Sequence, residues 1–574
     1  MNVGGESEVG KDGAPRSLVQ ALATLAPRFS PAARVEKLRV LDALAGARIT
    51  RATTLARLHE SLCFVHAYPD DPEVLARVED GLRAFPARVR RLSPAERRRL
   101  HDTGIAETEL DYPFGLPMAR WLAGRFPLHT EVAWRNFDSG ERLEETLPLL
   151  VSQAEGEAFT EAGLGWRKWL ALAKGSRRMS DLALLVELFD RAPLPGPARD
   201  SLFEGLGLPI RWRLRGTAPS RTRAWLPDAP VHFHRDGLRS RPDLARELAR
   251  PIAVRPAAPP LARSLIEASR AAMATRGREL YAFSYPNPED VLLADLDRGL
   301  RIALIGLAPD ARLPLEAYYA FFALKNGVPI GYGAGWGMFG RLEFAVNVFE
   351  AFRQGESAHV IGQVLRVYRQ IFRMRVVVID RTQLGDGLGN VEALRSGAFY
   401  FYRRLGFHPL DPASRRLCQH EEARIARDRR YRSPLPVLRR LVRTEMALRL
   451  GRAGASPLTG NAIATLVTDR VARVFGGDRR TAQREDAARV ARALGATGWR
   501  RWPGPQRRAF ARLAPVVALV PDLARWPAAE RVALTRVMRA KGAAGEHAYV
   551  RMLDAQRRLR AALEALVTGG GNRT

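Results

Sequence analysis

The residues best placed for chemistry surround a predicted turn between a strand and a helix. Apolar and polar residues alternate through 341–352, which predicts a strand. Apolar residues then recur at helical spacing from Val360 to Phe372. The connection Arg353–Ser357 therefore ends at a helix N-terminus, where unpaired backbone N–H groups and the positive end of the helix dipole bind phosphate groups. A connection of this kind is a candidate anion site.

Other motifs in the chain do not complete a site. The stretch Gly385–Gly389 follows a strand and precedes a helix, but its spacing differs from that of a dinucleotide-binding loop. His232 and His234 could offer two metal ligands from one strand face, yet no third ligand lies nearby in the sequence. Cys63 and Cys418 form neither a disulfide framework nor a metal-ligand pattern. We therefore expect no metal.

The elements that must position the anion site read as mixed α/β. Asn326-Gly327 between apolar segments predicts a hairpin, because both residues tolerate the positive φ of a type I′ turn. Val291–Leu296 and Leu300–Leu307 read as a hairpin or as a helix leading into a strand. Arg375–Asp380 is short, β-branched and typical of a parallel strand after a crossover helix. A further helix from about 390 to 405 and an extended piece at 406–410 complete the domain.

The two flanks of this domain read as helical. We expect a disordered tail at 1–17, a mainly helical region at 18–275 with up to two subdomains, the α/β domain at 276–412, and an arginine-rich helical region at 413–574. The predicted fold class is thus α/β, with a central mixed sheet and packed helices between all-helical N-terminal and C-terminal segments. At 574 residues the chain is long enough for several cores.

The formal net charge is +30, and the C-terminal part carries most of it. Residues 409–574 hold 34 Lys and Arg against 14 Asp and Glu, an excess of 20. Such a surface attracts nucleic acid, acidic proteins or anionic lipid. The few lysines and abundant alanine also fit the codon bias of a GC-rich genome, so both explanations stay open. No apolar run reaches the ~20 residues of a membrane span, and we expect a cytoplasmic protein.

Three stretches carry a resemblance to a known superfamily. They are the hairpin 325–333, the strand, loop and helix at 346–365, and Asn390-Val391-Glu392-Ala393 followed by Phe401–Phe407. Together they resemble the catalytic half of the GNAT superfamily of acyl-CoA-dependent N-acyltransferases, over about a quarter of the chain. The whole chain also resembles a bacterial protein family with a GNAT-like centre, which implies the fold but no substrate.

The resemblance assigns roles to particular residues. Asn347, Val348 and Phe349 would hydrogen-bond the pantetheine arm of coenzyme A and place the thioester, where a backbone N–H can polarise the carbonyl. Tyr402 matches the tyrosine that protonates the departing thiolate. The remaining residues implied to bind the cofactor, mostly around its pyrophosphate, are Arg353, Gln354, Gly355, Ser357, Ala358 and Asn390.

The attacking amine must also lose a proton, which requires a base or a water relay. Glu343 and Glu350 are the candidate bases of the strand, and Glu343 is preferred because it shares the face of Asn347. The sequence departs from the superfamily in two places. Glu356 occupies the first glycine position of the pyrophosphate loop, and the interval from Asn390 to Tyr402 is about one helical turn longer than usual.

Three functional hypotheses follow from these observations. The first is an N-acyltransferase that moves an acyl group, most simply acetyl, from acyl-CoA to an unidentified amine. The second is a catalytically silent GNAT-shaped scaffold whose basic helices bind nucleic acid or an acidic protein. The third is a FemABX-like transferase, a branch that also departs from the glycine-rich loop and takes aminoacyl groups from transfer RNA.

Overall fold

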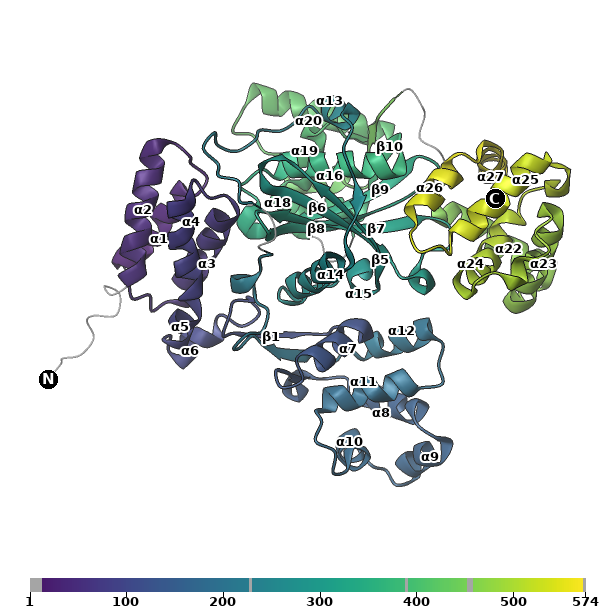
Figure 1. Ribbon diagram of the computed structural model, residues 1–574, viewed down its shortest axis with the longest axis horizontal. Helices are drawn as coiled ribbons and strands as arrows, with labels where there is room; N and C mark the ends of the chain where they lie inside the picture. The colour runs from purple at the N-terminus through teal and green to yellow at the C-terminus, as the bar shows by residue number, and fades with distance from the viewer. Residues whose placement is uncertain (1–12, 227–229, 388–390, 452–457, 571–574) are drawn as a thin grey trace.

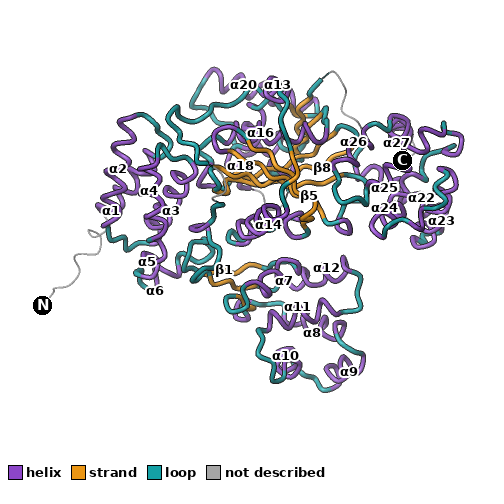
Figure 2. Tube along the Cα trace, viewed as in Figure 1, coloured by secondary structure: helices purple, strands orange, loops and turns teal. Residues whose placement is uncertain are grey.

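The computed structural model describes residues 13–226, 230–387, 391–451 and 458–570. A central sheet lies between a helical bundle formed by the N-terminal residues and a second group of helices at the C-terminal end (Figure 1). A smaller unit of strands and helices lies below the central sheet in the same view. Figure 2 shows that the strands concentrate in the middle of the molecule and in this smaller unit.

The central sheet has nine strands in the order β11-β12-β10-β9-β8-β7-β6-β5-β4. Only β9 and β10 run parallel, and every other neighbouring pair is antiparallel. The strands are β4 (Arg255–Pro256), β5 (Pro286–Asp295), β6 (Leu300–Leu307), β7 (Ala317–Lys325), β8 (Val328–Met338), β9 (Arg341–Val348), β10 (Val376–Ile379), β11 (His408–Pro409) and β12 (Met446–Arg449).

Several local predictions for this sheet are confirmed. Strands β5 and β6 form the hairpin that was one of two interpretations of their apolar runs. Asn326 and Gly327 connect β7 to β8 with φ values of 48° and 76°, as the predicted turn requires. Strand β10 follows the predicted crossover helix and pairs in parallel with β9. Strand β9 is shorter than predicted, because Glu350–Phe352 form a turn of 3₁₀ helix.

Helices cover both faces of the sheet. On one face α16 (Ser357–Phe372) packs its Tyr368 ring against Phe321 and Phe344. On the other face Phe283 of α15 (Tyr281–Ser284) contacts Phe322, which points away from Phe321 because successive strand residues face opposite sides. The long helix α14 (Pro259–Ala274) lies beside α15, across the sheet from α16 (Figure 1).

The segment after β10 differs from the prediction in two ways. The predicted helix of 390–405 is divided into α18 (Val391–Ser396) and α19 (Ala398–Arg404), because Gly397 takes a positive φ of 75°. Strand β12 lies in the region predicted to be all helical and inserts between β10 and β11. The short helix α17 (Arg381–Leu384) follows β10, and α13 (Leu244–Ala249) lies against α16, where Gln363 donates to Glu247 at 2.8 Å.

The N-terminal region is helical only in part. Its first unit is a bundle of α1 (Gly13–Leu25), α2 (Pro31–Gly46), α3 (Ala52–Ala67), α4 (Pro72–Arg83), α5 (Phe85–Arg90) and α6 (Pro94–Arg98). Its second unit is the antiparallel sheet β1-β3-β2, with strands β1 (Glu109–Tyr112), β2 (Thr130–Val132) and β3 (Ile210–Arg213). The helices of this unit are α7 (Leu116–Arg125), α8 (Gly140–Thr146), α9 (Gln153–Glu161), α10 (Trp166–Lys174), α11 (Asp181–Arg191) and α12 (Gly196–Leu206). The expectation of an all-helical N-terminal segment was therefore wrong for β1–β3.

The C-terminal helices dock onto the central sheet through a buried polar cluster. Tyr319 of β7 donates to Asp290 of β5 at 2.8 Å, and the backbone N–H of Glu546 donates to both residues. Glu546 also pairs with Lys541.

The C-terminal helices are α20 (Pro412–Arg427), α21 (Leu435–Leu441), α22 (Gly460–Phe475), α23 (Arg479–Leu494), α24 (Gly504–Val517), α25 (Ala528–Ala540), α26 (His547–Asp554) and α27 (Arg557–Gly570). Across the described ranges, none of the helices has the length and apolar character of a membrane span.

Candidate functional site

The parallel strands β9 and β10 separate after three residue pairs. Arg341–Glu343 lie opposite Val376–Val378, and the rest of β9, to Val348, has no strand partner on that side among the described residues. A cavity of about 340 Å³ lies along this unpaired part of β9. It is lined by Val346, Asn347, Val348, Arg353, Ser357, Ile361, Gln383, Ala393, Ser396, Ala398, Phe401 and Tyr402. We call this cavity the cleft.

The cleft brings together five of the eleven residues predicted for the site. They are Asn347, Val348, Arg353, Ser357 and Tyr402. Strand β9, the start of α16 and helix α19 each supply part of this group, so residues 55 positions apart in the chain meet around one space. The sequence did not indicate Gln383, Ser396 or Phe401, which complete the wall from the loop and helices after β10.

Helix α16 begins at this cleft with unpaired donors. The backbone N–H groups of Ser357, Ala358 and His359 have no acceptor among the described residues. The Ser357 hydroxyl donates to the carbonyl of Arg353 at 3.1 Å, which tightens the turn into the helix. These donors add to the positive end of the dipole of a 16-residue helix. The start of α16 therefore has the local chemistry of an anion site.

Glu356 turns away from the cleft. Its carboxylate is 1% exposed and accepts from Lys325 Nζ at 2.6 Å and from the backbone N–H of Arg239 at 2.7 Å. Arg298 Nε lies 3.3 Å from the same group. Burial alone would raise the pKa of Glu356, but the Lys325 ammonium and these hydrogen bonds lower it to about 2. The carboxylate at the first glycine position is thus neutralised by its neighbours and does not line the cleft.

Five predicted site residues lie outside the cleft: Phe349, Gln354, Gly355, Ala358 and Glu343. A Cβ on Gly355 would come within 2.9 Å of the Tyr68 ring, so this glycine allows the end of α3 to approach the turn. Phe349 is buried, with its ring 5.5 Å from that of Tyr332. Gln354 is exposed, and Ala358 packs against the core. The predicted contact at Asn390 falls outside the residues that the structure describes.

Tyr402 places a protonated phenol at the wall of the cleft. Its side chain is 5% exposed, and its ring packs 5.6 Å from that of Phe407. The phenol makes no hydrogen bond to the described residues. Burial raises the pKa of Tyr402 above its ordinary value, so the group stays protonated at neutral pH. The position and the protonation state both suit a proton donor.

Glu343 lies on β9 but not in the cleft. Burial raises the pKa of its carboxyl to about 7, and Arg341, 3.9 Å away, only partly opposes the shift. Asp380 and Glu445 add to the shift by charge repulsion. Glu343 and Asn347 are four positions apart, which corresponds to about 13 Å along a strand. The pKa of Glu343 thus lies near neutrality. At this distance from Asn347, Glu343 could take the proton of the amine only through the acceptor molecule itself or through a water molecule.

Comparisons with protein-family models, with curated proteins and with solved structures found no match. The interpretation of this site therefore depends on its geometry.

A second carboxyl that titrates near neutrality was missed by the sequence analysis. Burial raises the pKa of Glu279 to about 7, although the backbone N–H of Gly115 donates to it at 2.7 Å. The adjacent Arg278 reaches the cleft: in the amide orientation that satisfies both side-chain atoms, its Nη1 donates to Asn347 Oδ1 at 3.0 Å. The only sequence signal was a charged pair, Arg278-Glu279, at the start of the predicted α/β domain.

The two histidines considered as metal ligands have a structural role. The rings of His232 and His234 lie 4.8 Å apart, and Arg298 contacts His234 Nδ1 at 2.9 Å. Burial lowers the pKa of His234 to about 3, so its ring is neutral and accepts this hydrogen bond. Within the described ranges, no three His, Cys, Asp or Glu side chains are grouped as metal ligands would be.

Proposed function

We propose that the protein transfers an acyl group, most simply acetyl, from acyl-CoA to an amine. The observation that carries the proposal is the cleft along the unpaired part of β9, which ends at the N-terminus of α16. Unpaired strand edges can hydrogen-bond an extended pantetheine arm, and the helix N-terminus can bind the diphosphate. These two features stand next to each other, as an acyl-CoA molecule requires.

The cleft residues suit the steps of such a transfer. The amine nitrogen attacks the thioester carbonyl, and a backbone N–H near Asn347 and Val348 stabilises the tetrahedral oxyanion. The intermediate then collapses by breaking the carbon–sulfur bond, and Tyr402 donates its proton to the departing thiolate. The nitrogen loses one proton to a base, for which Glu343 is our candidate. The products are an amide and free coenzyme A.

The environment of Glu356 removes the main electrostatic objection to this proposal. A carboxylate beside a diphosphate would repel it by roughly 4 kcal/mol at 4 Å near a protein surface. Lys325 and Arg298 instead hold this carboxylate in the interior, on the far side of the turn from the cleft lining. The departure from the superfamily loop is therefore compatible with diphosphate binding.

The proposal is tested by following the acyl group. The protein is incubated with acetyl-CoA carrying an isotope label in the acetyl group, together with a pool of small amines and acidic proteins. We expect labelled amide products by mass spectrometry and one free thiol released per amide. If label transfer persists in the variant Ile361→Trp, in which the new side chain fills the cleft, the cleft is not the acyl-CoA site.

A second candidate function is supported by the surface of residues 412–443, which comprise α20, α21, the loop between them and the two residues after α21. Ten arginines of this segment are exposed, while Glu421 is buried and accepts from Ser433 and Tyr431. The arginines are Arg415, Arg416, Arg424, Arg427, Arg429, Arg430, Arg432, Arg439, Arg440 and Arg443. We propose that this basic segment binds a polyanion, which includes the RNA donor of the FemABX-like hypothesis.

Salt dependence tests the second candidate. Affinity for a single-stranded RNA should fall steeply with salt, and replacing four of the exposed arginines (Arg427, Arg429, Arg430 and Arg440) by Gln should flatten that slope. No binding at low ionic strength would contradict the polyanion proposal. Aminoacyl transfer from charged transfer RNA, with no turnover of acetyl-CoA, would replace the first candidate by the FemABX-like one.

A further inference from the structure

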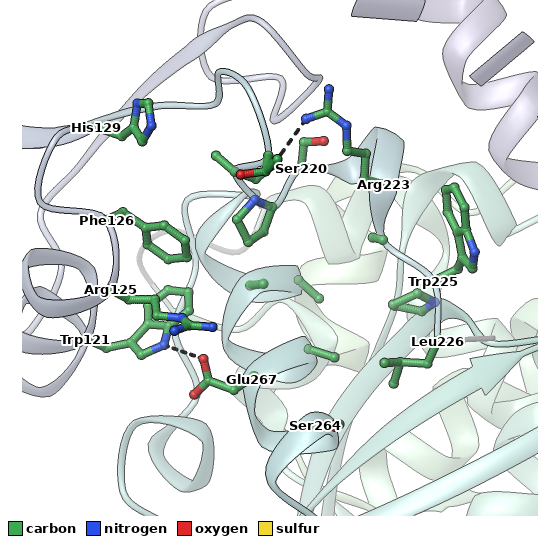
Figure 3. A pocket seen from close by; sticks show the side chains of 18 of the residues that line it. Trp121, Arg125, Phe126, His129, Ser220, Arg223, Trp225, Leu226, Ser264 and Glu267 are labelled. Carbon is green, nitrogen blue, oxygen red and sulfur yellow. Dashed lines mark hydrogen bonds between the residues drawn. The ribbon is translucent and has the colours of Figure 1, made fainter. Parts of the chain in front are cut away.

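A second cavity, of about 670 Å³, lies between α7, the loop 217–226 and α14 (Figure 3). Trp121, Arg125 and Phe126 line it from α7 and the residue after it. Ser264 and Glu267 line it from α14. The volume falls within the range of small-molecule sites, roughly 300–1,000 Å³. Nothing in the acyl-transfer proposal uses this space.

The cavity exists because α14 presents small side chains along one stripe. Ser264, Ala268, Ala271 and Ala272 follow the spacing i, i+4, i+7 and i+8, and all four line the cavity. Larger side chains of the helix, such as Leu265, are buried in the core. The stripe therefore leaves a flat, apolar floor rather than a packed contact.

The opposite wall is aromatic and well supported. The rings of Trp121 and Phe126 lie 5.3 Å apart in an edge-on arrangement. Both pack against Trp212 of β3, at 5.9 and 5.1 Å, and Trp212 is fully buried. This support holds the two rings in place without a ligand. A flat apolar molecule could stack against such a wall at little entropic cost.

The charged residues of the cavity favour an anion. Arg125 makes no hydrogen bond or ion pair with the described residues. Arg223 uses Nη1 on backbone carbonyls, including that of Ala218 at 3.4 Å, and its other N–H groups have no described partner. Glu267 already accepts from Trp121 Nε1 at 2.9 Å and pairs with Arg270 at 3.5 Å. The cavity thus has two guanidinium groups with free donors and one carboxylate that is already satisfied: Figure 3 shows Arg125 near Glu267 at one end and Arg223 beside Ser220 at the other.

A buried hydroxyl at the cavity wall lacks a partner. Ser220 lines the cavity and is 2% exposed, and its Oγ has no hydrogen-bond partner in the described residues. An unpaired buried hydroxyl costs free energy, so such groups are rare unless a ligand or water completes them. Together with the free guanidinium donors, this hydroxyl indicates a polar group of a bound molecule.

The cavity is separate from the cleft. Its floor is α14, which lies across the central sheet from α16, where the cleft begins. Pro329, at the start of β8, is the part of the sheet that reaches it. The two spaces share no lining residue. A ligand can therefore occupy one while the other is empty.

We propose that this cavity binds an organic anion with a flat apolar body, such as an aromatic carboxylate, sulfonate or phosphate ester. The ring system stacks between the aromatic wall and the α14 stripe. The anionic group pairs with Arg223 and accepts the hydroxyl hydrogen of Ser220, and Arg125 adds positive charge at the other end of the cavity. The inference stands independently of acyl transfer, since it uses none of the cleft residues.

The test is a calorimetric titration of the full-length protein with two probes of equal size and opposite charge. We expect naphthalene-1-sulfonate to bind with a 1:1 stoichiometry and at least tenfold more tightly than 1-naphthylmethylammonium. Ala268→Phe fills the floor and should weaken sulfonate binding at least tenfold. Arg125→Gln should weaken sulfonate binding severalfold and reduce the preference for the anion. Arg263→Gln and Arg263→Phe, at an exposed α14 position outside the cavity, should change neither affinity.

Several results would overturn the proposal. They are sulfonate binding weaker than millimolar, equal affinity for the two probes, or unchanged binding in both Ala268→Phe and Arg125→Gln. Competition between the sulfonate and acetyl-CoA would also overturn it, because it would place the probe in the cleft. Arg125 is exposed, so its variant remains informative if the α14 variant does not fold. Failure of acetyl-CoA to bind, with the sulfonate still bound, would leave this inference intact.

Discussion

At the scale of single residues, the cleft wall carries a phenol that stays protonated, and two carboxyl groups outside the cleft lining, Glu343 and Glu279, titrate near neutrality. Burial is the first cause in each case: it raises the pKa of Tyr402, and it raises the pKa of Glu343 and of Glu279 to about 7. Perturbed groups of opposite function close to one cavity are typical of acid–base sites. Each of these groups can be tested by a substitution that changes one atom.

Tyr402→Phe should lower kcat by about 100-fold, because the departing thiolate loses its proton donor. The dissociation constant of acetyl-CoA should change by less than about twofold, since the ring remains. Tyr400→Phe is the matched control: it lies on the same helix, its hydroxyl bonds to Ser433 at 2.6 Å, and it does not line the cleft. Single-turnover kinetics and calorimetry separate the two quantities. An unchanged kcat in Tyr402→Phe would remove this residue from the mechanism.

The pH dependence of kcat/KM should report the general base. A base acts in its deprotonated form, so activity should rise with pH through about 7, the pKa of Glu343, and be lost below it. Glu343→Gln should abolish this ascending limb. Glu279→Gln is the companion variant, because Glu279 has a similar pKa. If the ascending limb persists in Glu343→Gln and disappears in Glu279→Gln, Glu279 is the general base.

At the scale of elements, the start of α16 is the critical feature. Ser357→Asp places a negative charge beside the unpaired N–H groups, where a diphosphate would bind. We expect the affinity for acetyl-CoA to fall at least tenfold, about 1.4 kcal/mol. Binding of S-acetylpantetheine, which lacks the diphosphate, should not change. Equal losses for the two thioesters would contradict the placement of the diphosphate at this helix.

The turn before α16 depends on the buried pair of Lys325 and Glu356. Lys325→Met leaves the carboxylate buried without its main partner and should destabilise the fold by about 3–5 kcal/mol at pH 7. The folded-state pKa of Glu356, about 2, lies below its ordinary value of 4.5, so the stability it contributes is present above pH 4.5 and is lost as the pH falls toward 2. Urea unfolding at pH 7 measures the loss, and Lys325→Met combined with Glu356→Gln should recover part of it. No recovery would show that the cost is one of packing.

The elements that sequence could predict are those whose signals are local. The Asn326-Gly327 turn and the β-branched run at Val376–Ile379 depend on the residues themselves, and both were found where predicted. Strand β12 has only four residues, Met446–Arg449, and its place between β10 and β11 is set by distant partners. Strand β3 likewise pairs with β1 about 100 residues earlier in the chain. Such pairings leave no periodic signal in a short strand.

The candidate site shows the same division. The strand, turn and helix that frame the cleft were predictable, because alternation and helical spacing mark them. The orientation of Glu356 was not, since Arg239, Arg298 and Lys325 come from three separate segments. Gly355 was predicted to serve the cofactor, but its close neighbour is Tyr68, almost 300 residues earlier. Contacts between distant segments decide these details.

At the scale of the whole molecule, the C-terminal helices are fixed to the sheet rather than tethered beside it. Arg312 is 6% exposed and donates to the carbonyls of Lys541, Ala543 and Ala544 at 2.6–2.8 Å. Three carbonyls near the interface thus depend on one guanidinium. The arginine-rich C-terminal region is therefore a part of the same folding unit as the proposed transferase domain.

Arg312→Met should cost about 3–5 kcal/mol, because it removes charged hydrogen bonds and leaves buried carbonyls unsatisfied. Arg508→Gln is the matched control: it breaks an exposed pair with Asp310 and should cost less than about 1 kcal/mol. Chemical unfolding followed by circular dichroism and by tryptophan fluorescence measures both. Coincident transitions are expected for the native chain. A separate, earlier transition of the C-terminal helices would contradict their docking.

The most direct test of the proposed transferase is whether the cleft holds acyl-CoA. Calorimetric titration of the full-length protein with acetyl-CoA should give saturable binding with one site per chain. Ile361→Trp, which fills the cleft at the first turns of α16, should abolish this binding, and circular dichroism of the variant checks that it is folded, because Ile361 also contacts the core. Absence of binding up to millimolar acetyl-CoA, or undiminished binding in the filled variant, would contradict the account.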